Sequence, residues 1–170
     1  MVHTTLPFYA GTADKKFTRA VRDIARRQSV LFHGTSLGSL IARTNTLLYP
    51  TVGDPAISFT RSPETAVHFA TLPKDYDDGL PTVFVFNRQS LRSRYRVEPY
   101  QCPPPENHKE GKFEMEEMIW HRDVEHVSRH LSAIVYCVMD DVFVETDISE
   151  MSRSYKQIAA ACAVASLEFR

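Results

Sequence analysis

The runs with the strongest tendency to form strands are short, and helical or irregular sequence separates them. Branched and aromatic residues concentrate in five predicted strands: Val30–Phe32, Ile57–Thr60, Thr82–Phe86, Glu117–His121 and Ser132–Met139. A further short strand is expected near Leu47–Tyr49. Short strands that alternate with helices along one chain predict an α+β domain.

Helices are predicted at both ends of the chain and after the second strong strand. Residues 13–28 carry an apolar stripe of Phe17, Val21 and Ile24, and from residue 147 onward the sequence is alanine-rich. Ser62 followed by Pro63 is typical of a capped helix start. Arginines occupy the other faces of the first helix: Arg19, Arg22, Arg26 and Arg27. We interpret them mainly as a solvated face, with a nucleic-acid or partner contact as the alternative.

Length and composition predict a single domain in a reducing compartment. The 170 residues, 43% of them apolar, suit one domain over 1–170, with a motif-bearing core at about 30–138 and helical extensions. Three cysteines without a CxxC spacing favour neither a disulfide framework nor a cysteine zinc site. The chain shows neither a signal-peptide pattern nor a membrane-spanning apolar run, so we expect a cytoplasmic protein, the cytoplasm of a host included.

Three short stretches carry polar residues at or beside predicted strands. "VLFHGTS" contains His33, Gly34 and Thr35, "AISFTRS" contains Ser58 to Arg61, and "FEMEEMIW" contains three glutamates. Each stretch alone is a weak signal, because a histidine at a strand end is usually a core residue. Their order along the chain and their places on separate strands give the set its weight.

This set resembles the fingerprint of the ADP-ribosyltransferase family over about residues 30–138. One branch of that family has Arg, then Ser-x-Ser, then Glu-x-Glu; the other has His-Gly-Thr/Ser, then Tyr, then Glu. The present chain is similar to a blend of the two and to small phage and bacterial proteins, with Ser58 where the second branch has its tyrosine. The resemblance implies a fold split into two small antiparallel sheets with flanking helices. It also implies that the protein is a toxin or a phage effector.

The resemblance implies an NAD-dependent mono-ADP-ribosyltransferase, which cleaves the nicotinamide–ribose bond and transfers ADP-ribose to a macromolecule. His33, which also counts among the candidate catalytic residues, would hold the adenosine-side ribose, and Arg61 would pair either with pyrophosphate or in a surface salt bridge. The other expected NAD-binding residues are Gly34, Thr35, Ser58, Phe59 and Thr60. NAD is then a co-substrate, bound without the Rossmann GxGxxG, and we expect no metal. A net charge of −1 favours a protein over a nucleic acid as the acceptor.

Two adjacent glutamates compete for the catalytic position. Glu116 and Glu117 lie on opposite faces of a strand, so only one of them can face the cleft. The family's acid commonly stands directly before the apolar residues of its strand, which favours Glu117. The Glu-x-Glu pattern selects Glu116 instead, with Glu114 orienting the acceptor. We therefore expect Glu117, with Glu116 as the alternative.

The same residues are compatible with other functions. The chain could hydrolyse NAD without an acceptor, or be an inactive binding or inhibitory module of the same fold. RNA 2′-phosphotransferases, which also consume NAD, use two histidines and two arginines, and His33 is the one histidine placed well here.

Overall fold

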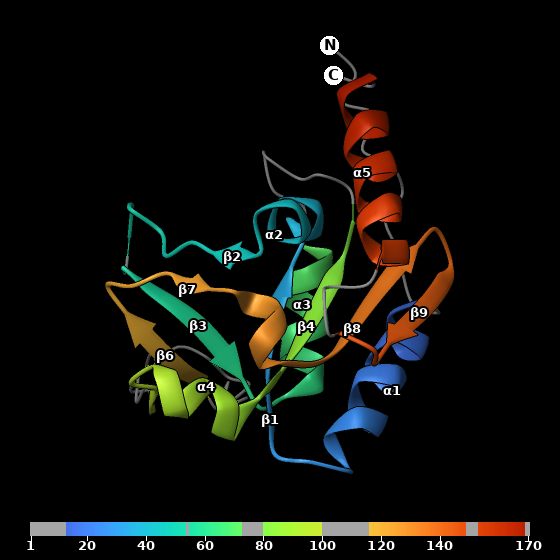
Figure 1. Ribbon diagram of the computed structural model, residues 1–170. Helices are drawn as coiled ribbons and strands as arrows, with labels where there is room; N and C mark the ends of the chain where they lie inside the picture. The colour runs from blue at the N-terminus through green and yellow to red at the C-terminus, as the bar shows by residue number, and fades with distance from the viewer. Residues whose placement is uncertain (1–12, 54, 73–79, 100–115, 149–152, 169–170) are drawn as a thin grey trace, which may run out of the picture.

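The computed structural model describes residues 13–53, 55–72, 80–99, 116–148 and 153–168. In this part of the chain it is a mixed α+β fold, as predicted (Figure 1). The helices are α1 Ala13–Ala25, α2 Gly38–Thr44, α3 Pro63–Thr71, α4 Arg88–Arg94 and α5 Arg153–Glu168, with the 3-10 turn η1 Val127–His130. The strands are β1 Val30–Thr35, β2 Thr46–Leu47, β3 Ala56–Thr60, β4 Thr82–Asn87, β5 Glu98–Pro99, β6 Glu116–Trp120, β7 Val124–Glu125, β8 Leu131–Val138 and β9 Asp141–Glu145.

The described strands form one large sheet and one small one. Seven strands follow the order β5-β6-β3-β1-β4-β8-β9, and β2 pairs with β7. Every pair is antiparallel. The expected split into two small sheets is present only in part: β1 and β3 separate after one shared pair of residues, but that pair joins the halves into a single sheet.

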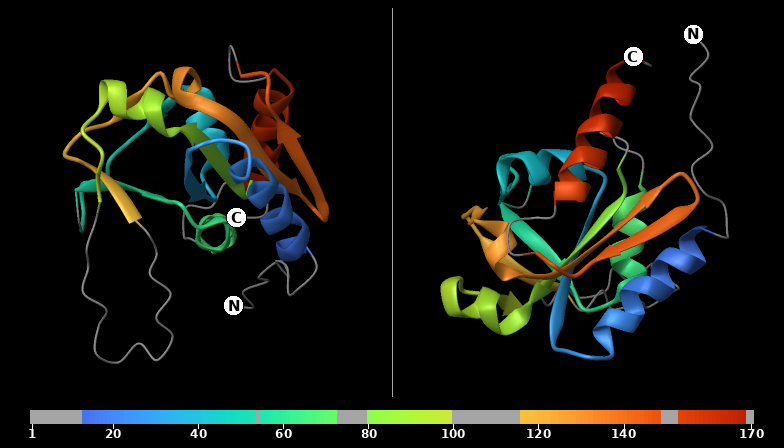
Figure 2. Two further views of the ribbon diagram at one scale, coloured as in Figure 1. Left: turned by 90° about the horizontal axis from the view of Figure 1, so that it is seen from below. Right: turned by 45° about the vertical axis from the view of Figure 1, so that its right-hand side comes forward.

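Helices cover both faces of this sheet and enclose two separate cores. Helices α1 and α3 pack on one face, through residues such as Phe17 and Ala66. Helices α2, α4 and α5 pack on the other, where Leu91 and Tyr155 join the larger core. Figure 2 shows α1 and α3 together on the side of the sheet away from α4. Burial on both faces explains why the interior strand β4 is apolar from Val83 to Phe86.

Two helices begin at caps that the local sequence specifies. The Ser62 hydroxyl accepts a hydrogen bond from the backbone N–H of Thr65 at 3.1 Å, and Pro63 takes the first helical position of α3. Asn87 accepts a hydrogen bond from the N–H of Ser90 at 2.9 Å and starts α4 directly after β4. The predicted helix after Ser62 is confirmed.

The remaining differences from the predicted elements are local. Residues 147 and 148 are not helical, the last helix is described over Arg153–Glu168, and β9 was not predicted. Strand β2 ends at Leu47, so the strand expected near Leu47–Tyr49 lies slightly earlier. Within the described residues, no helix has the length and apolar character needed to cross a membrane.

Candidate active site at the division of the sheet

The large sheet divides between β1 and β3. Strand β1 forms six residue pairs with β4 but meets β3 only at Phe32 and Thr60. Beyond that pair the two strands separate, and a pocket of about 260 Å³ lies at the division. Its lining comes from β1, β3, β6, α3 and the segment after β2: Phe32, His33, Gly34, Leu48, Pro50, Ala56, Ile57, Ser58, Phe59, Thr60, Thr65, Phe69 and Glu116.

The side chain of His33 joins the two strands where their backbone pairing has ended. Its Nδ1 lies 2.9 Å from the carbonyl oxygen of Ser58. A carbonyl can only accept a hydrogen bond, so Nδ1 carries the proton and donates. In the neutral ring, Nε2 is then the acceptor nitrogen. His33 thus lines the pocket with a defined tautomer, and the adjacent ring of Phe59, at 5.9 Å between centroids, supports it.

Strand β6 presents Glu116 to the pocket. It pairs with β3 so that Glu116 lies opposite Thr60 and Glu117 lies opposite Phe59. Residues directly opposite in an antiparallel pair share a face, so Glu116 is on the face of Thr60 and Ser58. Glu116 is half-buried and lines the pocket. Of the two candidate acids, Glu116 is the one that lines the same pocket as His33.

The expectation that Glu117 faces the cleft is wrong. Glu117 is 1% exposed. It pairs with Phe59 and lies on the face of the sheet that packs into the larger core. Its Oε1 is 2.8 Å from Arg61 Nε and 2.8 Å from Arg88 Nη2, and Arg88 Nε donates to Oε2 at 3.3 Å. A buried carboxylate requires this kind of pairing. Glu117 therefore ties β6 to the residue after β3 and to the first residue of α4.

The same contact corrects one expectation for Arg61. Its Nε is engaged by a carboxylate that is almost fully buried, so this is not a surface salt bridge. Arg61 does not line the pocket, and its contact with a pyrophosphate stays a prediction.

Gly34 and Thr35 have structural roles that the motif did not indicate. A Cβ built on Gly34 would lie 1.8 Å from the carbonyl oxygen of Ala66, so the glycine allows α3 to approach β1. Its backbone still lines the pocket. Thr35 is 4% exposed, does not line the pocket, and accepts a hydrogen bond from the N–H of Leu37 at 3.0 Å just before α2.

Hydroxyls and apolar side chains complete the pocket. Ser58 is exposed, whereas the Thr60 hydroxyl accepts a hydrogen bond from the N–H of Ser62 at 3.0 Å. Phe59 is 1% exposed, and its ring packs edge-on against Phe86, so its part in the pocket is mainly to support His33. Glu114, the expected acceptor residue, lies outside the described residues.

Leu48, Thr65 and Phe69 also line the pocket, although they lie outside the three sequence motifs. Leu48 is 61% exposed and Phe69 is 37% exposed, so both leave apolar surface at the pocket. Thr65 and Phe69 are four residues apart on α3 and therefore share one face. The cap at Ser62 fixes where α3 starts, and this signal could have placed both residues beside β3.

A comparison of this chain with protein families, curated proteins and solved structures found no match in any of the three.

Proposed function

We propose that this protein is an NAD-dependent mono-ADP-ribosyltransferase with an ADP-ribosyltransferase-type fold. The observation that carries the proposal is the meeting of His33 and Glu116 in one pocket, beside Ser58 and Thr60. The three motifs of the resemblance lie on β1, β3 and β6, which are neighbours in the sheet although residues 33 and 116 are far apart along the chain.

The pocket has the size and the groups to hold the nicotinamide riboside half of NAD. An apolar cavity of roughly 150 Å³ takes up benzene, so about 260 Å³ has room for one aromatic ring and a sugar. The Nε2 acceptor of His33 suits a ribose hydroxyl, which can donate to it. The exposed apolar surface of Phe69 and Leu48 suits the flat face of a ring.

Glu116 would act on the reacting ribose. When the bond from the ribose C1′ to the nicotinamide nitrogen breaks, its electron pair leaves with the neutral ring and positive charge develops on the sugar, as in glycoside cleavage. A fixed carboxylate beside that sugar stabilises the charge as it forms. An acceptor nucleophile then bonds to C1′ and loses its proton, which Glu116 is able to take.

The test is release of nicotinamide from NAD by the wild-type protein and by two glutamine variants. Glu116→Gln removes the charge at nearly constant shape, and we expect turnover to fall by at least about 100-fold while NAD binding and folding are kept. Glu98→Gln is the matched control, because Glu98 lies in the neighbouring strand β5, pairs with Arg96 and does not line the pocket. It should leave turnover unchanged.

The same experiment separates transfer from its alternatives. Nicotinamide release without an acceptor identifies an NAD glycohydrolase, and label from NAD found on a macromolecule identifies a transferase. Full activity of Glu116→Gln would contradict the proposed mechanism. NAD binding with no nicotinamide release in any condition would identify an inactive binding module.

A further inference from the structure

Helix α1 concentrates positive charge that the rest of the chain does not have. Residues 13–27 contain six of the 20 Lys and Arg residues but only two of the 21 Asp and Glu residues. The segment therefore carries a formal charge of +4, although the whole chain has −1. A charge averaged over the chain hides this separation, and that average was the basis for favouring a protein acceptor.

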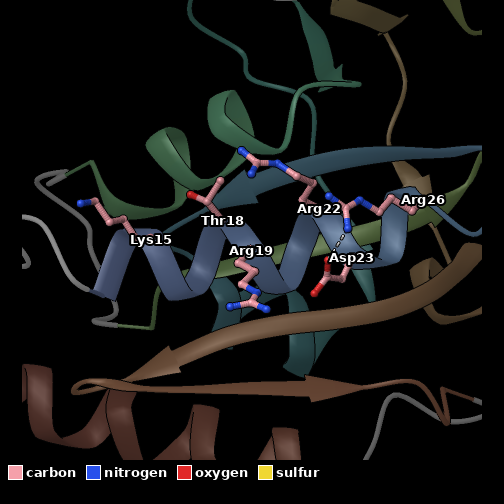
Figure 3. A pocket seen from close by; sticks show the side chains of 6 residues that line it. All are labelled: Lys15, Thr18, Arg19, Arg22, Asp23 and Arg26. Atoms are coloured by element: carbon pink, nitrogen blue, oxygen red, sulfur yellow. Dashed lines mark hydrogen bonds and ion pairs between the residues drawn. The ribbon is translucent and has the colours of Figure 1, made fainter.

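Four of the cations form one stripe along α1, which we call the basic stripe: Lys15, Arg19, Arg22 and Arg26. Their spacing of four, three and four residues puts them on one face of the helix, about 5.5 Å apart along its axis and about 16 Å from end to end. Together with Thr18 and Asp23 they line a shallow hollow of about 580 Å³ (Figure 3). All four are exposed to solvent.

Acidic neighbours neutralise the basic stripe only in part. Arg22 extends toward α3, where it pairs with Glu64, and Arg19 points away from that helix (Figure 3). The hydrogen bond from Arg22 is the main cause of the lowered pKa of Glu64, so that carboxylate stays ionised at neutral pH. Asp23 lies 3.5 Å from Arg26, whose side chain is 71% exposed. Two acids against four cations leave a net positive face.

The chemistry of the basic stripe fits phosphates better than a protein surface. Arginine binds phosphate through two parallel N–H groups, and a regular row of such groups matches a backbone of repeating anions. Stable protein interfaces instead need buried aromatic or apolar anchors at their centre. None of the exposed large apolar residues in the described part of the chain lies on α1. Its apolar residues Phe17 and Val21 are fully buried beneath it.

We infer that the basic stripe of α1 is a docking surface for the sugar–phosphate backbone of a nucleic acid. It contacts phosphates without stacking on bases, so it binds without sequence preference and with strong dependence on salt. Helix α1 packs beside α3 on one face of the sheet, and Thr65 and Phe69 of α3 line the candidate active site. A nucleic acid on the stripe is thus held on the side of the sheet that carries α3. Binding of this kind needs no NAD turnover.

The test is fluorescence anisotropy with a labelled 20-base-pair DNA duplex and a labelled single strand, without NAD, over a series of salt concentrations. Neutralising about four phosphates of a duplex gives a slope of log K against log salt of about −3.6. The variant R19Q/R26Q should lower that slope by about 2 units and weaken duplex binding about 60-fold at 0.1 M salt. R26Q alone should lower the slope by about 1 unit. Arg26 follows the last residue of α1, so this single variant tests the stripe even if the double variant does not fold.

The matched control is R92Q/R94Q, which removes two exposed arginines from α4 on the other face of the sheet. It should change the affinity less than about threefold if α1 is the docking surface, because α4 packs on the opposite face of the sheet from α1. An equal loss in this control would overturn the inference, as would absence of binding to both DNA probes at 50 mM salt. Competition by polyglutamate as strong as that by unlabelled DNA would also overturn it, because the stripe would then be a site for an acidic protein.

Discussion

The buried ion triad of Glu117, Arg61 and Arg88 makes a strong prediction about stability. Glu117→Gln removes a charge at constant size and leaves two guanidinium groups facing a neutral amide. At an effective dielectric constant of 20, opposite charges about 4 Å apart attract by about 4 kcal/mol. The net effect is smaller than two such terms, because the desolvation of the carboxylate in the wild-type fold opposes them.

The exposure of the two arginines sets the final magnitude. Removing one partner of a buried pair typically costs about 3–5 kcal/mol. Here the side chains of Arg61 and Arg88 are 46% and 28% exposed, so water solvates them in part once the carboxylate is gone. We therefore expect Glu117→Gln to lower the free energy of unfolding by about 2–4 kcal/mol. For a chain of 170 residues this corresponds to a fall in Tm of about 5–15 °C.

Urea unfolding followed by circular dichroism measures this effect, with Glu98→Gln as the control. Glu98 pairs with Arg96 at the surface, where the arginine side chain is 88% exposed, so its loss should cost less than about 0.5 kcal/mol. A wild-type midpoint for Glu117→Gln would refute the burial of its charge. Loss of NAD cleavage by this variant at a temperature where it is fully folded would refute the assignment of the pocket acid to Glu116.

Two further predictions concern packing and pH. Gly34→Ala should lower the free energy of unfolding by at least about 2 kcal/mol, measured in urea, because its Cβ would overlap the backbone of Ala66 in α3; a change below about 0.5 kcal/mol would contradict this contact. Burial lowers the pKa of His130 from its usual value of 6.5, so the unfolded chain binds protons more readily and stability should fall as the pH drops below 6.5. His130→Gln should show a smaller fall in urea midpoint between about pH 7.5 and about pH 5, and an unchanged fall would argue against the effect of partial burial on the pKa of His130.

The elements predicted well are those with local causes. The start of α3 follows from Ser62 and Pro63, and β4 follows from five consecutive β-forming residues. Strand β9 depends instead on five pairs with β8, and as an edge strand with Phe143 and Val144 exposed it has a weaker signal. The single residue pair between β1 and β3 is likewise a feature of the tertiary structure. Motifs indicated that β1, β3 and β6 carry the site, but the division of the sheet that makes its pocket appears only in the fold.

The choice between Glu116 and Glu117 shows why local sequence could not complete the site. In a strand with one solvent-exposed face, the polar residues indicate which face is exposed. In β6 both faces are covered, because Met118 is 4% exposed on one face and Ile119 is 2% exposed on the other. Alternation then separates the two glutamates without saying which face holds the pocket. Arg61 and Arg88 decide it, because together they neutralise a carboxylate inside the larger core. Arg88 reaches Glu117 only because α4 starts at the end of β4, three strands away from β6 in the sheet. The acid that lines the pocket is thus selected by where the other one finds its counter-charges.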